Sequence, residues 1–315
     1  MRRSAHASSR PRVPPRKFAA RRPPLLQLSY IHSTERMSIA TARIRFRSSA
    51  VPVCSHKGGN EMDINLRDRV ALVTGGGRGI GRAIALSLAK AGASVAVNYR
   101  RDKDSAAEVI AAIAKLDRKA KSYCASVEDL ADDARMVADV VRDFGHIDIL
   151  VNNAGIASRG HTVADTDPEE MERVIRVHAI APYYLSKLAL PHMRKRARGD
   201  IVMISSIATL KNSANGAPYN MAKAAMEALA LTLAKEERGH NIRTNIVAPS
   251  LTVTEMGSRL AKATSGISDI AQLNAKSPFG RVSVPDDVAS VVTFLVSEAS
   301  AYVNGQKINI DGGGT

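Results

Sequence analysis

An apolar run, a glycine-rich turn and a helix-like segment follow one another between residues 69 and 93. The run is RVALVTG (69–75), and GIGRAIALSLAKAGA (79–93) has the apolar periodicity of a helix. Glycine at positions 75, 79 and 81 allows a tight turn whose backbone can approach a ligand closely. Amides at the start of the helix would face that ligand and favour an anion such as pyrophosphate. The pattern predicts a dinucleotide-binding unit; an ordinary glycine-rich turn is the alternative.

Strand-like and helix-like segments alternate through the rest of the chain. Strands are expected at 94–99, 119–125, 147–153, 200–206, 242–249 and 305–311, and helices at 104–116, 128–143, 168–196 and 217–238. The strands are uninterrupted apolar runs, which is typical of a parallel sheet covered on both faces. The predicted fold class is therefore α/β: a single Rossmann-type, doubly wound parallel sheet of about seven strands with helices on both faces.

Residues 1–61 differ from everything that follows. They are rich in Arg, Ser and Pro, and residues 1–60 hold eleven Arg and two Lys against one acid, Glu35. Most of the formal net charge of +15 therefore belongs to this segment. We expect a disordered basic extension, either translated from a start upstream of Met62 or acting as a transit-like sequence for an organelle. Residues 62–315 would form one NAD(P)-binding Rossmann domain.

Composition excludes several classes of protein. The chain has no apolar run of 18 residues, which argues against a membrane helix and a membrane partner. Two cysteines without a C-x-x-C arrangement argue against a disulfide framework and against a bound metal, and they favour a cytoplasmic location. The nearly balanced charge after residue 61, with no Trp and 4% aromatic residues, argues against a nucleic-acid partner.

Three residues in the second half of the chain suit proton transfer to a carbonyl group. Tyr219 and Lys223 are four residues apart on an expected helix, so their side chains share a face. A nearby cation lowers the pKa of a phenol, and we expect Lys223 to do this for Tyr219. Ser206, at the end of an expected strand, could hydrogen-bond the same carbonyl oxygen. The expected hydride donor is a nicotinamide, because no side chain supplies hydride.

Taken together, these motifs resemble the short-chain dehydrogenase/reductase family. The resemblance rests on Thr74-Gly75-x-x-x-Gly79-x-Gly81, NNAG (152–155), Tyr219-x-x-x-Lys223, Ser206 thirteen residues before the tyrosine, and GQKINIDGG (305–313). It covers residues 66–315 and is greatest to the 3-oxoacyl-acyl-carrier-protein reductase-like branch. It implies an oxidoreductase that interconverts a ketone, such as the 3-oxo group of an acyl thioester, and a secondary alcohol. It also implies a homotetramer.

The resemblance also implies which residues hold the cofactor. Those residues are Gly75, Arg78, Gly79, Ile80, Gly81, Tyr99, Arg100, Ser126, Val127, Asn153, Ala154, Gly155, Pro249 and Thr254, together with Tyr219 and Lys223. The second strand ends at Tyr99 and is followed by two arginines, with no acid before Asp102. Guanidinium groups suit a 2′-phosphate, so NADP(H) is the expected cofactor, with Arg78 of the glycine loop and Arg100 as the main contacts and NAD(H) possible.

Three positions depart from the family pattern. His178 replaces the helix asparagine that anchors a relay water, although imidazole can still donate and accept a proton. Ser126 replaces an aspartate that often contacts adenine, and Pro249 is followed by Ser250 instead of glycine. The catalytic candidates are therefore Ser206, Tyr219, Lys223 and His178. Residues 255–280 correspond to the family's variable substrate lid.

Two alternatives remain open from the sequence. The segment VAVNYRRD (95–102) also resembles sugar dehydrogenases of the same family. A catalytically silent dinucleotide sensor that binds a protein partner is the alternative from a different class. Such a sensor would not need Tyr219 or Lys223, and both are present.

Overall fold

The structure is a computed structural model that describes residues 64–314; the side chains of residues 263–265 are not described. The expected extension at 1–61 lies outside the described residues. Seven strands form one sheet, which confirms the predicted fold class. The strands are β1 (Val70–Val73), β2 (Ser94–Tyr99), β3 (Ala120–Cys124), β4 (Ile149–Asn152), β5 (Gly199–Ile204), β6 (Ile242–Pro249) and β7 (Lys307–Ile310).

All neighbouring strands are parallel, in the spatial order β3-β2-β1-β4-β5-β6-β7. The chain winds outward from β1 in one direction and then from β4 in the other. The strand order therefore reverses between β1 and β4. Ligands of such sheets bind at the carboxyl ends of the strands beside this reversal.

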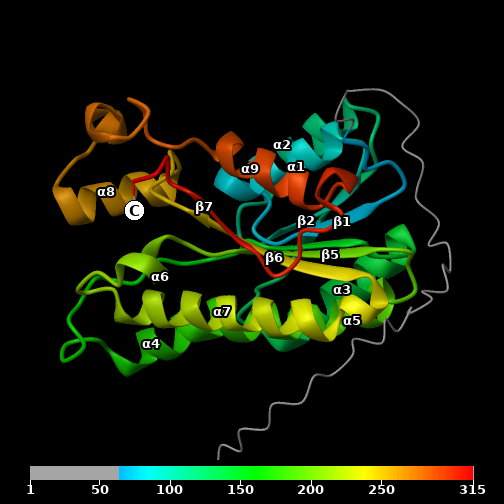
Figure 1. The fold of residues 1–315 in the computed structure, drawn as a ribbon, viewed down its shortest axis with the longest axis horizontal. Helices are drawn as coiled ribbons and strands as arrows, with labels where there is room; N and C mark the ends of the chain where they lie inside the picture. The colour runs from blue at the N-terminus through cyan, green and yellow to red at the C-terminus, as the bar shows by residue number, and fades with distance from the viewer. Residues whose placement is uncertain (1–63, 315) are drawn as a thin grey trace, which may run out of the picture. The chain divides into compact units, whose positions relative to one another are not determined.

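Helices cover both faces of the sheet (Figure 1). The α-helices are α1 (Gly79–Lys90), α2 (Lys103–Ala114), α3 (Leu130–Phe144), α4 (Pro168–Ile175), α5 (Ala181–Met193), α6 (Ala208–Lys211), α7 (Ala217–Glu236), α8 (Glu255–Ser265) and α9 (Pro285–Leu295). Shorter helical segments are η1 (Arg176–Ile180), η2 (Arg238–His240), η3 (Ile270–Lys276) and η4 (Glu298–Ser300). Helices α1, α2 and α9 lie on one face, and α3, α4, α5 and α7 lie on the other.

Two hydrophobic clusters hold these layers together. On one face, Leu88 of α1 and Val292 of α9 are fully buried with the sheet side chains. On the other face, Val140 of α3 and Met226 of α7 are buried in the same way. Each such side chain contributes roughly 1.5–3 kcal/mol relative to exposure to water. The sheet is therefore buried on both sides, which explains its uninterrupted apolar strands.

Helix α9 was not expected from the sequence, although its start carries the usual signals. Pro285 occupies the first turn, and the Asp287 carboxylate accepts a hydrogen bond from the Val284 N–H at 2.8 Å. Proline in the first turn and acids near a helix N-terminus are both favourable. The helix packs on α1, where the Ser87 and Thr293 hydroxyls are 2.8 Å apart.

The helix expected over 168–196 is interrupted. Residues 176–180 form one π-helical segment, in which the Ala181 N–H bonds to the Arg176 carbonyl five residues back. Pro182 directly follows and has no N–H with which to continue the regular pattern. Such bulges often occur at functional sites. This one contains His178, a candidate catalytic residue.

A second helix-containing segment covers the region expected to be the substrate lid. Helix α8 begins after Thr254, whose Oγ1 accepts a hydrogen bond from the Gly257 N–H at 2.9 Å. Segment η3 follows, and Ala261, Ile270 and Val282 form a small separate hydrophobic cluster there. Across residues 64–314, no helix is both long enough and apolar enough to cross a membrane.

Candidate active site

The predicted cofactor residues lie at one edge of the sheet, after the carboxyl ends of five strands. Gly75, Arg78, Gly79, Ile80 and Gly81 follow β1, and Tyr99 and Arg100 end or follow β2. Ser126 and Val127 follow β3, Asn153 to Gly155 follow β4, and Pro249 and Thr254 end or follow β6. The fold thus brings residues far apart in the sequence to the edge where the strand order reverses.

The glycine-rich loop has the geometry of a phosphate cradle. Gly75 and Gly79 have φ of 60° and 53°, values that side-chain-bearing residues rarely adopt. A Cβ atom on Gly81 would lie 2.2 Å from the Gly75 carbonyl oxygen, so only glycine fits there. No side chain caps the N-terminus of α1, and its first turn contains no acid. These features fit the pyrophosphate of a dinucleotide.

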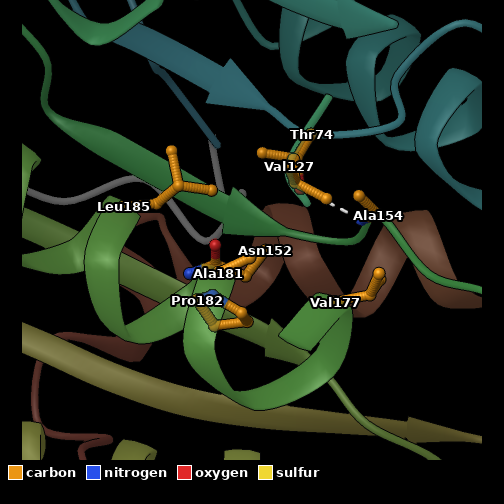
Figure 2. Close-up of a pocket in the computed structure, with 8 residues that line it drawn as sticks. All are labelled: Thr74, Val127, Asn152, Ala154, Val177, Ala181, Pro182 and Leu185. Carbon is orange, nitrogen blue, oxygen red and sulfur yellow. Dashed lines mark hydrogen bonds between the residues drawn. The ribbon is translucent and has the colours of Figure 1, made fainter. Parts of the chain in front are cut away.

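Side chains from β1, β2 and β4 hold this loop in place. Thr74 Oγ1 accepts hydrogen bonds from the Asn153 and Ala154 N–H groups at 2.9 and 3.0 Å, and Figure 2 shows the bond to Ala154. The Asn153 side chain donates to the Thr74 carbonyl at 2.8 Å. Asn98 Oδ1 accepts from the Gly75 N–H at 3.1 Å. Sequence reasoning missed Asn98, because only the fold places it beside the loop.

A small hollow lies behind this loop (Figure 2). Mostly apolar side chains line it: Thr74, Val127, Asn152, Ala154, Val177, Ala181, Pro182 and Leu185. None of the catalytic candidates lines this hollow. We interpret it as a packing gap beneath the cofactor-binding edge.

Both arginines that were expected to bind a 2′-phosphate are paired with carboxylates. Arg78 lies 2.8 Å from Glu255 of α8, and both side chains are more than half exposed. Arg100 lies 2.6 Å from Glu128, which Arg173 also contacts at 2.9 Å. Exposed ion pairs contribute only about 0–1 kcal/mol, so a doubly charged phosphate can compete for these arginines. Neither glutamate was identified from the sequence.

The first acid after β2 serves another purpose. Asp102 Oδ1 accepts from the Ser105 N–H at 3.0 Å, and Asp102 Oδ2 accepts from the Ser105 hydroxyl at 2.7 Å. It thereby caps α2, and these bonds lower its pKa.

Three of the four catalytic candidates converge between β5 and α7. Tyr219 and Lys223 lie one turn apart on α7, and the Lys223 Nζ is 5.7 Å from the Tyr219 ring centroid. Ser206, just after β5, is close enough to Tyr219 to lower its pKa. Lys223 is 3% exposed, and its Nζ donates a hydrogen bond to the Ile204 carbonyl at 2.6 Å. The sequence spacing therefore identified side chains that do meet.

Burial dominates the protonation of this group. It raises the pKa of Tyr219, and the contact with Ser206 only partly opposes this. Burial also lowers the pKa of Lys223 to about 7, although Glu227 opposes that change. The pKa of Tyr219 therefore lies above its usual value, opposite to the expected direction. The reason is that loss of water disfavours the charged phenolate more than the contact with Ser206 favours it.

His178 lies against the same tyrosine. Its ring packs edge-on to the Tyr219 ring, with centroids 5.2 Å apart, and its Nε2 is 2.8 Å from the Ile156 carbonyl oxygen. Burial, and secondarily the charge of Lys223, lower its pKa to about 3, so the ring is neutral. A Cβ on Gly155 would lie 2.7 Å from the ring, which explains the glycine of the NNAG motif. Among the described residues, none bonds its buried Nδ1.

The fold and the site define a class of proteins that bind a dinucleotide and move a proton at a carbonyl. Comparisons identify the family. A family described as "Enoyl-(Acyl carrier protein) reductase" matches residues 75–315. The chain belongs to the short-chain dehydrogenase/reductase family, and it is an oxidoreductase acting on CH–OH or C=O groups.

Individual relatives agree with this assignment. Versicolorin reductase 1 of Aspergillus parasiticus is 37% identical over 255 residues, covering 79% of this chain and 97% of the relative. Tetrahydroxynaphthalene reductase of Pyricularia oryzae is 36% identical over 259 residues, which cover 79% of this chain and 90% of the relative. A short chain dehydrogenase from Burkholderia cenocepacia J2315 was solved in complex with NADP. It is 34% identical in sequence and matches with a TM-score of 0.72, over 79% of this chain and 98% of that protein.

Proposed function

We propose that this protein is an NADPH-dependent reductase that converts an apolar ketone to a secondary alcohol. The observation that carries the proposal is the convergence of Ser206, Tyr219 and Lys223 beside the glycine-rich loop. The two fungal relatives described above are both named reductases. A silent dinucleotide sensor would have no need for this arrangement.

The proposed chemistry uses the protonation states that burial creates. A bound nicotinamide would supply the hydride. Tyr219, kept protonated by its raised pKa, would donate its hydroxyl proton to the ketone oxygen, which the Ser206 hydroxyl would hold. Charged Lys223 would stabilise the phenolate that remains. The replacement proton would reach Tyr219 from solvent, and His178, which packs on the tyrosine ring, would help to position that relay while remaining neutral itself.

The cofactor preference rests on Arg78 and Arg100. They lie after β1 and β2, where the adenosine ribose of this fold binds, and Tyr99 stands where an acid would repel a 2′-phosphate. The nearest candidate acid, Asp102, caps α2. The structural relative with bound NADP is consistent with this preference. NAD(H) remains the alternative cofactor.

The lid favours an apolar substrate over a sugar. Val253, Met256 and Phe279, in the segment that borders the cofactor edge, are 40%, 41% and 78% exposed. Such side chains suit a hydrophobic ketone. The name of the Pyricularia oryzae relative, tetrahydroxynaphthalene reductase, points to a hydroxylated aromatic compound, and a 3-oxoacyl thioester is the second candidate.

Self-association is part of the proposal. Ile180 and Tyr183, next to or on α5, and Met221 and Leu231 on α7 expose apolar surface to solvent. The two helices cover the same face of the sheet (Figure 1). A homotetramer built through these helices would bury them, and light scattering would measure its mass. A cytoplasmic location stays a prediction.

The decisive experiment measures initial rates with NADPH and NADH against a hydroxylated naphthalenone, a 3-oxoacyl thioester and an oxidised sugar. We expect the highest kcat/KM for NADPH with the aromatic ketone. Arg100→Asp should weaken NADPH far more than NADH, because only NADPH carries the 2′-phosphate. Arg118→Asp is a matched control, since Arg118 lies before β3. Equal kcat/KM for both cofactors in the parent enzyme would refute the NADPH assignment.

A further inference from the structure

Glu227 lies one turn beyond Lys223 on the catalytic face of α7. Its side chain is only 16% exposed. It accepts hydrogen bonds from the Ser205 hydroxyl at 2.5 Å and from the Thr209 hydroxyl at 2.8 Å. Both partners belong to the segment that carries Ser206. A carboxylate on α7 therefore holds the segment that follows β5.

A lysine from the last strand completes this group. The Lys307 Nζ lies 2.8 Å from the Glu227 carboxylate and donates to the Thr209 Oγ1 at 2.6 Å. Lys307 is 80 residues from Glu227 in the sequence. The contacts join α7, the segment after β5 and β7, and they place a partly buried ion pair directly behind the catalytic residues.

The segment after β5 is fastened to α7 at two consecutive residues. Lys223 donates to the Ile204 carbonyl at 2.6 Å, and Glu227 binds the hydroxyl of the next residue, Ser205. Ser206 follows immediately, and Tyr219 projects from the same helix. The position of Ser206 relative to Tyr219 is therefore set by two oppositely charged side chains of α7.

We propose that Glu227 is a positioning residue of this enzyme: with Lys307 it anchors Ser205, holds Ser206 at Tyr219, and places a carboxylate one helical turn from Lys223. This inference rests on the proposed reaction at Ser206, Tyr219 and Lys223. Glu227 need not touch the substrate, because it acts through the two residues that it holds.

The charge of Glu227 has a measurable consequence at Lys223. The groups that face Lys223 are neutral His178 from η1, Tyr219 and Glu227 from α7, and the Ile204 carbonyl from β5. Glu227 is the negatively charged member, and it opposes the lowering of the Lys223 pKa by burial. Its removal should lower that pKa further, whereas removal of Lys307 should raise it.

The test reads the titration of Lys223 directly, by NMR of the full-length protein carrying ¹³C-labelled lysine. Glu227→Gln keeps an oxygen for Ser205 and loses the charge, so the Lys223 midpoint should fall by about one pH unit. Lys307→Met should move the midpoint in the opposite direction. Glu236→Gln, at the exposed end of α7, is the matched control and should leave it unchanged. An unmoved midpoint in Glu227→Gln overturns the electrostatic role.

Kinetics test the positioning role and distinguish the two proposals. In Glu227→Gln the alkaline limb of the kcat profile should move with the Lys223 midpoint, which lowers kcat roughly tenfold at about pH 8. Glu227→Leu should also raise the KM for the ketone, because Ser205 loses its hydrogen-bond acceptor. Glu227→Gln, which keeps an oxygen for Ser205, should have the KM of the parent. Equal ketone KM in the two variants overturns the positioning role. If the parent reduces no ketone, the proposed function fails, and the NMR titration still decides the role of Glu227.

If Glu227→Gln does not fold, Lys307→Met carries the same test. It leaves the carboxylate in place and removes only its cationic partner, so the Lys223 midpoint should rise. A midpoint that falls or does not move overturns the inference.

Discussion

Both ends of the parallel sheet carry a carboxylate paired with basic side chains, and the two groups differ in what surrounds them. At the carboxyl end, Glu227 and Lys307 lie next to Ser206 and the catalytic face of α7. At the amino end, Asp200 is the second residue of β5 and is 2% exposed. The predicted cofactor and catalytic residues lie at the first end, and none lies at the second.

The amino-end group contains more positive charge. Asp200 lies 2.8 Å from Arg69, 3.1 Å from Arg198 and 2.6 Å from Arg243. Arg243 also donates to the Leu295 carbonyl at 2.7 Å, and thereby joins β6 to the end of α9. Burial raises the pKa of Asp200 although all three arginines oppose it. This group fastens the sheet to its C-terminal helix.

The comparison shows that a buried ion pair does not by itself indicate a functional site. Such pairs occur where strands and helices must be joined without leaving a charge unpaired. Location decides the role: the carboxyl-end pair is next to the residues proposed to move protons, and the amino-end group lies near the opposite ends of the strands. Changes at the carboxyl-end group should therefore mainly affect activity, whereas changes at the amino-end group should mainly affect stability.

The largest expected effect is at the carboxyl end. Tyr219→Phe removes only the phenolic oxygen, so turnover should fall by ~10²–10⁴-fold, the usual contribution of a general acid. The melting temperature and NADPH affinity, measured by fluorescence titration, should match those of the parent. A variant that keeps more than about half of the activity would contradict the assignment of Tyr219 as the acid.

The next largest effect is at the amino end, where stability should fall and turnover should stay unchanged. Asp200→Asn leaves the buried charges of Arg69 and Arg243 without a carboxylate, which should cost about 3–5 kcal/mol of unfolding free energy, whereas Arg198 keeps its ion pair with Glu298. Urea denaturation measures the loss. The kcat of the folded fraction and its pH profile should not change. A shifted pH profile with parent-like stability would overturn the distinction between the two ends.

A third carboxylate sharpens the comparison, because it has no basic partner. Asp133 of α3 is fully buried, and within the described part of the chain neither carboxylate oxygen has a hydrogen-bond partner. Burial, assisted by Asp132 and Asp129, raises its pKa to about 7. The folded protein then binds more protons than the unfolded chain between about pH 4 and about pH 7, so stability falls as the pH rises through that range.

Asp133→Asn should remove this dependence. At about pH 8 the variant should be more stable than the parent by roughly 1–3 kcal/mol, whereas at about pH 4 the two should agree. Urea denaturation at both pH values measures the difference, and Asp104→Asn, at an exposed position of α2, is the control. A variant that is less stable at the higher pH would mean that the Asp133 charge is compensated.

Sequence reasoning recovered the fold because its signals are local or periodic. Uninterrupted apolar strands, amphipathic helices and glycines at fixed spacing depend on residues close together in the chain. It also recovered Tyr219 and Lys223, since four residues on a helix fix their common face. It missed α9 despite a proline and two acids in its first turn, and it did not foresee the π-helical interruption next to Pro182.

What the sequence by itself determined is the sheet of seven parallel strands, the glycine-rich turn after the first strand and the side chains that meet at Tyr219. The tertiary structure alone decided the meeting of Lys307 with Glu227, the seating of Asn98 on the glycine loop, and the raised pKa of Tyr219. The physical reason is that a hydrogen bond or ion pair between distant residues, and the loss of water around a buried group, depend on how the elements pack. The periodicity of a single segment does not indicate how that segment packs against the others.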